Sequence, residues 1–126
     1  MQHFLLVVLG GGAGAGMRHL VNLYSLRAFG PNFPWGTLIV NIAGSFLMGV
    51  FIEVLVRKLG ATQELRLLVA TGFLGGFTTF SAFSLDTIVL WERGQLAIAA
   101  GYVTASVVFS ILALFTGLWA VRTLLN

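Results

Sequence analysis

The chain has 126 residues, of which 58% are hydrophobic and only 9% are charged, whereas an ordinary soluble domain has about 25% charged residues. Since a membrane-spanning helix needs about 20 apolar residues, this composition predicts a single integral membrane domain of four helices. The chain has no cysteine and only two histidines, so disulfides and a cysteine-based metal site are excluded. Its seven basic residues, against four acidic ones, give a net charge of +3. Because the basic residues are scattered along the chain, a nucleic-acid-binding face is excluded as well.

Four apolar segments follow one another along the chain, and we predict that each is a membrane-spanning helix. Each is long enough to cross a hydrocarbon core of about 30 Å at about 1.5 Å per residue. The connections are short, and the first contains Gly30, Pro31 and Pro34. The predicted spans of this all-α domain, residues 1–126, are residues 4–28, 35–56, 65–91 and 95–122.

The first segment contains the glycine-rich stretch GGGAGAG, residues 10–16. A nucleotide-binding loop is excluded because no Lys-Ser or Lys-Thr pair follows and no βαβ pattern surrounds it. The glycines instead recur four residues apart, Gly10 with Gly14 and Gly12 with Gly16, a spacing that lets helices approach closely in lipid. Arg18 follows them inside the same span, where a charged side chain needs a partner or a function.

Polar side chains form a stripe on each of two other segments. Both stripes place residues four apart on one helix face: Thr37, Asn41 and Ser45 in the second segment, and Tyr102, Ser106 and Ser110 in the fourth. Because an uncompensated polar group in hydrocarbon costs several kcal/mol, the two stripes together predict one polar path. The alternative is that these side chains only form hydrogen bonds between packed helices.

The third segment is interrupted by the stretch GFLGGFTTFSAF, residues 72–83. Paired glycines followed by two β-branched threonines have low helix propensity, so we expect a break near the middle of the span. A break frees carbonyl oxygens that protein, water or an ion must satisfy. Gly75 and Thr78 are the expected carbonyl donors to a cation, and a kink without an ion is the alternative.

Beyond this stretch, Phe80 and Phe83 lie on one helix face with Ser81 beside them. The edge of an aromatic ring carries partial positive charge, so two such rings can contact a small anion without adding a full charge. The alternative is that both phenylalanines pack in the core.

The basic residues give only a weak orientation signal. One end of the predicted bundle carries Arg57, Lys58, Arg66 and Arg122, and the other carries Arg18, Arg27 and Arg93. Since basic residues near span ends set orientation, a count of four against three is consistent with insertion in both orientations and with pairing of two opposed copies. Insertion in one orientation remains the alternative.

The stretches GGGAGAGMRH, WGTLIVNIAGSFLMG and GGFTTFSAF occur in this order, and the chain resembles the CrcB/Fluc family of fluoride channels along essentially its whole length. The resemblance implies passive, fluoride-selective efflux through the cell membrane of a bacterium, and no enzymatic activity. It implies an antiparallel homodimer of four-helix subunits with two fluoride pores and a structural sodium ion (Na+) at the dimer centre.

The resemblance also implies roles for individual residues. Gly75 and Thr78 match the sodium ligands, through their backbone carbonyls, and Arg18 matches an arginine near the vestibule. The pore residues implied are Asn41, Phe80, Ser81, Phe83, Tyr102, Ser106 and Ser110. Two positions depart from the family pattern: Ala82 stands where a threonine is usual, and Asp86 where many relatives have glutamate.

Two other functions remain open from the residues alone. A small proton-coupled multidrug exporter also has four helices, but it needs a membrane-embedded carboxylate, and the first segment has none. A non-conducting scaffold subunit would account for the glycines and leave the polar stripes without a role.

Overall fold

The computed structural model describes residues 1–59 and 62–125, apart from the side chains at positions 58 and 59. The Lys58 side chain, which enters the charge count above, therefore lies outside the described part. Helix α1 is Gln2–Phe29, α2 is Trp35–Val54, and α2 continues into a short π-helix, η1, Leu55–Leu59. The third rod consists of α3 (Gln63–Leu65), the π-helix η2 (Arg66–Leu74), α4 (Gly75–Phe77) and α5 (Phe80–Glu92), and α6 is Leu96–Leu124.

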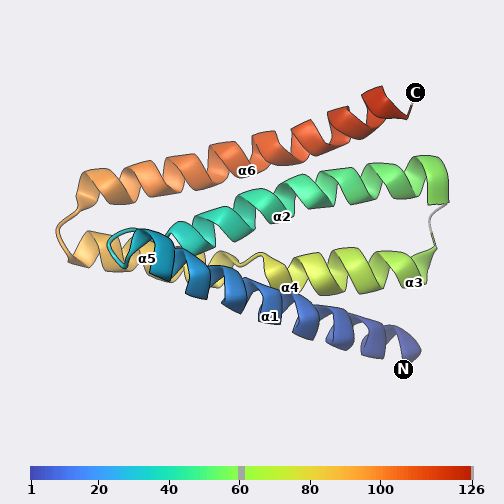
Figure 1. The fold of residues 1–126 in the computed structure, drawn as a ribbon, viewed down its shortest axis with the longest axis horizontal. Helices are drawn as coiled ribbons and strands as arrows, with labels where there is room; N and C mark the ends of the chain where they lie inside the picture. Colours follow the sequence, from blue (N-terminus) through green and yellow to red (C-terminus); the bar gives the residue numbers. More distant parts are fainter. Residues whose placement is uncertain (60–61, 126) are drawn as a thin grey trace.

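Four helical stretches are long and apolar enough to cross a membrane: Gln2–Phe29, Trp35–Arg57, Gln63–Glu92 and Leu96–Leu124. The predicted all-helical architecture of four span-capable helices is thus confirmed, and the described residues contain no strand. The first turn of α1, the end of η1, α3 and the last turn of α6 lie at one end of the bundle (Figure 1). The α1–α2 and α5–α6 connections lie at the other end.

Two glycines shape the connections at that second end. Gly30, with φ 81°, stops α1 and donates its N–H to the carbonyl of Leu26 at 2.9 Å. Gly94, with φ 79°, makes the turn between α5 and α6. A positive φ is accessible to glycine at little steric expense, which allows both turns to be short.

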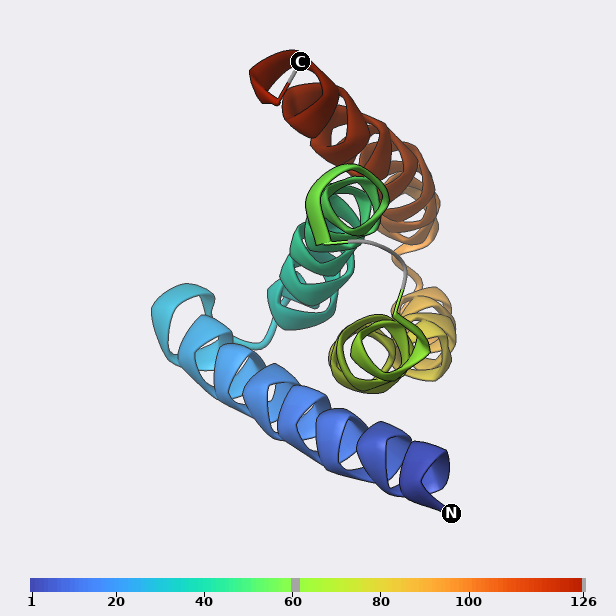
Figure 2. The same cartoon turned by 90° about the vertical axis from the view of Figure 1, so that its right-hand side faces the viewer.

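Two close helix pairs build the bundle. Helix α2 packs on α6, where Gly49 lies against the carbonyl of Leu114 and Gly117 against that of Phe46. Helix α1 lies on the side of α2 that is opposite α6, and there it crosses η2 and α4 (Figure 2). There Gly10 and Gly14 meet backbone atoms of the third rod, whereas Gly12 and Gly16 have open space beside them. Of the two glycine pairs noted in the sequence, only Gly10 and Gly14 make this contact with the part of the chain that the structure describes.

The buried core is small and lies at the α5 end of the bundle. Its cluster consists of Leu38, Phe83, Leu90, Ala99 and Tyr102. Most of the large apolar side chains on α1 and α6 are exposed, as expected for faces that meet lipid or another apolar surface.

Candidate functional site

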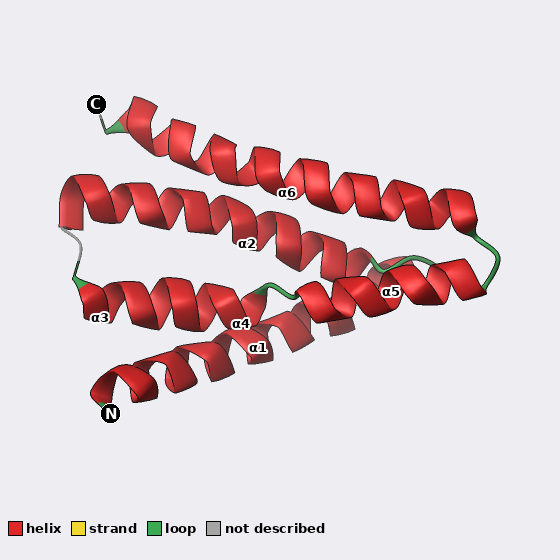
Figure 3. Cartoon of the chain, turned by 180° about the vertical axis from the view of Figure 1, so that it is seen from behind, coloured by secondary structure: helices red, strands yellow, loops and turns green. Residues whose placement is uncertain are grey.

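The third rod leaves the helical path at Thr78 and Thr79, between α4 and α5 (Figure 3). Thr78 has φ −82° and ψ 160°, and Thr79 has φ −153° and ψ 121°, so both backbones are extended. The hydroxyl oxygen of Thr79 caps α5 by accepting the N–H of Ala82 at 3.2 Å. This agrees with the preference of threonine for the N-cap position.

Two neighbouring helices contact this extended segment through polar side chains. From α2, Asn41 accepts the Thr79 N–H through Oδ1 at 2.7 Å and donates through Nδ2 to the Thr79 carbonyl at 3.0 Å. From α1, Arg18 donates through Nε to the carbonyl of Gly76 at 3.1 Å. The backbone groups released at the interruption are therefore partly satisfied by side chains far away in the sequence.

A cavity of about 430 Å³ lies among α2, the α4–α5 junction and α6; we call it the phenylalanine cavity. Both polar stripes contribute to its wall, and so do the two threonines and the two phenylalanines. Its polar and aromatic lining residues are Asn41, Ser45, Thr78, Thr79, Phe80, Phe83, Ser106 and Ser110. No lining residue carries a charge, so its polar groups among the described residues are all neutral.

The phenylalanine cavity has hydrogen-bonding capacity left over. The hydroxyl oxygens of Ser106 and Ser110 are buried and have no hydrogen-bond partner among the described residues. The rings of Phe80 and Phe83 lie 5.5 Å apart; Phe83 is buried, while Phe80 is 78% exposed at the surface of the single chain. Neutral donors and ring edges in an uncharged wall suit a small anion.

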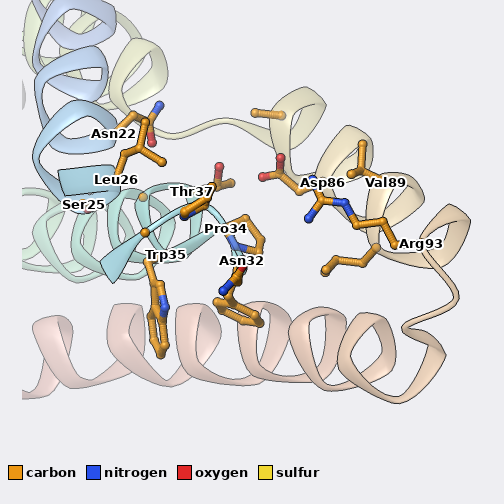
Figure 4. A pocket seen from close by; sticks show the side chains of 16 residues that line it. Asn22, Ser25, Leu26, Asn32, Pro34, Trp35, Thr37, Asp86, Val89 and Arg93 are labelled. Atoms are coloured by element: carbon orange, nitrogen blue, oxygen red, sulfur yellow. The ribbon is translucent and has the colours of Figure 1, made fainter. Parts of the chain in front are cut away.

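A second cavity, of about 370 Å³, lies at the end of the bundle that holds the α1–α2 connection (Figure 4); we call it the end cavity. Its lining includes Asn22 from α1, Thr37 from α2, Asp86 from α5, and Arg93, which directly follows α5. Asp86 and Arg93 are seven residues apart, about two helical turns, and so share a face. Sequence reasoning did not find this cavity, because it forms only where α1, α2 and α5 meet.

Tyr102 lies between the two cavities and lines neither of them. Its hydroxyl donates to Oδ2 of Asp86 at 3.1 Å, and its side chain is only 1% exposed. Its ring lies 5.3 Å from Phe83 of the phenylalanine cavity and 5.5 Å, edge-on, from Phe33 of the end cavity. Tyr102 is thus the partition between the two spaces.

The structure brings together most of the residues singled out in the sequence. Asn41, Phe80, Phe83, Ser106, Ser110 and Thr78 share the phenylalanine cavity. Four others lie apart: Ser81 is exposed with its Oγ 3.4 Å from Thr79 Oγ1, Gly75 is exposed on the third rod, Arg18 lies on the α1 side at Gly76, and Tyr102 is enclosed in the core.

The common metal-binding side chains do not gather in one place among the described residues. The described residues contain no group of three or more His, Asp or Glu side chains that would hold a metal ion. A cation at the interruption would instead depend on carbonyl oxygens, which suit a hard ion.

An ion-pair cluster at the opposite end of the bundle was also not anticipated. The buried Glu53 of α2 accepts hydrogen bonds from Arg57 Nε at 2.8 Å and from Arg122 Nε at 3.1 Å. The Glu53–Arg57 spacing of four residues is a signal readable in the sequence. The Arg122 contact, which ties α6 to α2, is not.

The chain is similar to known proteins over nearly its whole length. The family model for CrcB-like protein, Camphor Resistance (CrcB), matches residues 5–118. Proteins named fluoride-specific ion channel FluC are similar to the chain throughout: the one from Chelativorans sp. is 62% identical over 99% of this chain and 100% of its own. Those from Mesorhizobium japonicum and Agrobacterium fabrum are 60% and 54% identical over 98% of this chain and 99% of theirs.

Proposed function

Because the chain belongs to the CrcB family, we propose that it is a fluoride-specific ion channel through which fluoride leaves the cytoplasm passively. The observation that carries this proposal is the 62% identity, along its full length, to a protein named as such a channel. The four apolar helices make it a multi-pass protein of the cell membrane. Hydrogen fluoride crosses membranes as a neutral acid and ionises inside the cell, so the trapped anion needs a pore.

The phenylalanine cavity is the proposed fluoride path. Fluoride must lose water to enter it, and the serine hydroxyls of Ser106 and Ser110 supply donors in exchange. The edges of Phe80 and Phe83 add weak positive charge. The uncharged wall of the phenylalanine cavity holds the anion loosely enough for it to leave, as conduction requires.

The proposed path continues past Tyr102 into the end cavity. Tyr102 already gives its hydroxyl to a carboxylate, that of Asp86, so an arriving fluoride would compete with an oxygen anion for this donor. Fluoride is a stronger hydrogen-bond acceptor than chloride and is the better competitor. Arg18 contributes positive charge on the α1 side of the interruption, where its Nε donates to the Gly76 carbonyl.

The proposed working unit is a homodimer of opposed copies. One chain has too few helices to enclose a pore, and Phe80 is 78% exposed beside the phenylalanine cavity. A second copy would cover that ring and the apolar faces of α1 and α6. The antiparallel arrangement is supported by the weak charge asymmetry of the chain.

A structural sodium ion belongs to the same proposal. Gly75 and Thr78 would hold it through their carbonyl oxygens at the dimer centre. When bound, the ion supplies a fixed positive charge that holds the interrupted helices of two subunits together. The structure is compatible with this role because neither carbonyl accepts a backbone hydrogen bond from the described residues around the interruption.

The exporter alternative is not favoured by the carboxylates present. Glu53 is engaged by two arginines, and Asp86 by Tyr102. A carboxylate that exchanges protons for a cationic substrate needs an accessible position in the membrane interior.

The test is efflux from liposomes that contain the purified protein. Vesicles loaded with fluoride or with chloride are diluted into ion-free buffer, and release is followed with ion-selective electrodes. We expect rapid fluoride release and little chloride release. Equal release of both ions, or no fluoride release, would defeat the proposal.

A further inference from the structure

The interrupted segment is held from α2 by a single side chain. Asn41 forms two hydrogen bonds with one residue, accepting the Thr79 N–H at 2.7 Å and donating to the Thr79 carbonyl at 3.0 Å. Two such bonds exchanged with one extended residue are what a neighbouring antiparallel strand provides. The amide of Asn41 thus takes the place of a strand for the extended Thr79.

These bonds redirect a donor that would otherwise close the helix. In an α-helix, the N–H of Thr79 would donate to the carbonyl four residues earlier, that of Gly75. Asn41 Oδ1 takes this N–H instead. The Gly75 carbonyl consequently loses its helical partner.

The carbonyl of Thr78 also loses its helical donor. The N–H of Ala82 would donate to the Thr78 carbonyl in an α-helix, but it donates to Thr79 Oγ1 at 3.2 Å. The two diverted donors, the N–H groups of Thr79 and Ala82, would otherwise bond to the carbonyls of Gly75 and Thr78. These are the two carbonyls proposed above as cation ligands.

We propose that Asn41 is a positioning residue that keeps the third helix open at Thr79, and does not act chiefly as a ligand of the permeating anion. Through its two hydrogen bonds to Thr79, Asn41 leaves the Gly75 and Thr78 carbonyls free to bind a cation. The same bonds fix the position at which α5 begins, and therefore the positions of Phe80 and Phe83. The inference rests on the proposed channel function and concerns how one residue serves it.

The same bonds argue against Asn41 turning its amide toward the anion. To do so, it would leave the N–H of Thr79 without its partner inside the hydrocarbon region, where unsatisfied backbone groups are costly. The hydroxyls of Ser106 and Ser110 line the same cavity and have no partner among the described residues, so they can donate to an anion without breaking an existing hydrogen bond.

The decisive experiment is a double-mutant cycle between Asn41 and the Thr79 backbone. One variant is Asn41→Ala; the other is the full-length chain, made by semisynthesis, with an ester in place of the amide N–H of Thr79. Each change alone should lower fluoride flux about tenfold, the equivalent of one buried hydrogen bond. The double variant should lose much less than the product of the two losses, because contacting partners couple.

The ester replaces the amide between Thr78 and Thr79, so it also weakens the Thr78 carbonyl as a ligand. The test therefore depends on the coupling between the two changes and not on the effect of either change alone. If the losses multiply, or if the ester chain conducts normally while Asn41→Ala does not, Asn41 acts on the anion directly and the inference is wrong. Should Asn41→Ala fail to fold, the cycle is run with Asn41→Ser. An ester at Val108, on the exposed side of α6, and Thr116→Val, which removes only a hydroxyl bonded within α6, control for the two kinds of change.

A readout independent of flux is the thermal stabilisation of the purified protein by sodium. Asn41→Ala should need about tenfold more sodium than the unaltered chain for the same rise in melting temperature, and potassium should give no rise. An unchanged sodium requirement contradicts the positioning role. If the unaltered chain releases no fluoride from liposomes, the channel assignment itself fails, which is a different result from an uncoupled cycle in a conducting protein.

Discussion

The hydroxyl of Tyr102 lies 3.1 Å from Oδ2 of Asp86 and joins a buried residue of α6 to a carboxylate at the wall of the end cavity. The ring of Tyr102 meanwhile contacts Phe83 in the phenylalanine cavity. One side chain therefore contacts the linings of both cavities, through its ring and through its hydroxyl.

Tyr102→Phe should reduce fluoride flux about tenfold, because it removes one donor from the path and leaves Asp86 unpaired. The ring remains, so the core should stay packed. Flux is measured by fluoride release from liposomes. Adding Asp86→Asn to Tyr102→Phe should recover part of the flux, since the unpaired negative charge is removed. Normal flux in Tyr102→Phe would mean that only the ring matters.

Phe83→Ile should lower fluoride flux strongly while the protein still assembles, because isoleucine keeps much of the apolar volume and lacks a positive ring edge. Phe109→Ile, at an exposed position of α6, is the matched control and should conduct normally. Assembly is checked by size-exclusion chromatography with light scattering. Unaltered flux in Phe83→Ile would assign Phe83 to core packing alone.

Arg18→Met should abolish most of the fluoride flux, because the Gly76 carbonyl loses its partner and the interruption loses a positive charge. Arg18→Lys keeps the positive charge but lacks the Nε donor that contacts Gly76, so its flux should lie between those of Arg18→Met and the unaltered chain. Liposome release measured for both variants separates charge from hydrogen bonding. If Arg18→Met releases fluoride as fast as the unaltered chain, the contact with Gly76 is dispensable.

Glu53→Gln should lower the melting temperature of the purified protein by several degrees, since Arg57 and Arg122 lose a shared carboxylate. The fluoride flux per folded protein should not change, because the cluster lies at the end of the bundle opposite the end cavity. Glu92→Gln, at an exposed position on α5, is the control for loss of one negative charge. A loss of flux without a loss of stability would place Glu53 in the conduction path.

Two edited chains test the antiparallel dimer. Adding two lysines beside Thr62 should direct that end of the bundle to the cytoplasm, and adding two beside Asn32 should direct the other end there. Each edited chain expressed alone should fail to protect cells from fluoride, and the two expressed together should restore protection. Orientation is confirmed by tagging. Full protection by either chain alone, in a fixed orientation, would contradict the antiparallel arrangement.

The hydrophobic pattern by itself determined that this is a membrane protein with four span-capable helices. Those properties depend on composition and on run lengths, which are local along the chain. The same is true of the residues that weaken the third helix: Gly75, Gly76, Thr78 and Thr79 are adjacent, and their low helix propensity is readable without a structure. The stripe spacing likewise predicted that Ser106 and Ser110 share a helix face.

Only the tertiary structure decided which groups meet across the bundle. Asn41 reaches the backbone of Thr79 across 38 positions, and Arg18 reaches Gly76 across 58. Arg122 finds Glu53 across 69. A helical period tells which face a residue lies on, but not the rotation and axial shift of one helix against another. Those are set by close glycine contacts such as Gly44 of α2 against Thr78, and they determine that Asn41 meets the backbone of Thr79.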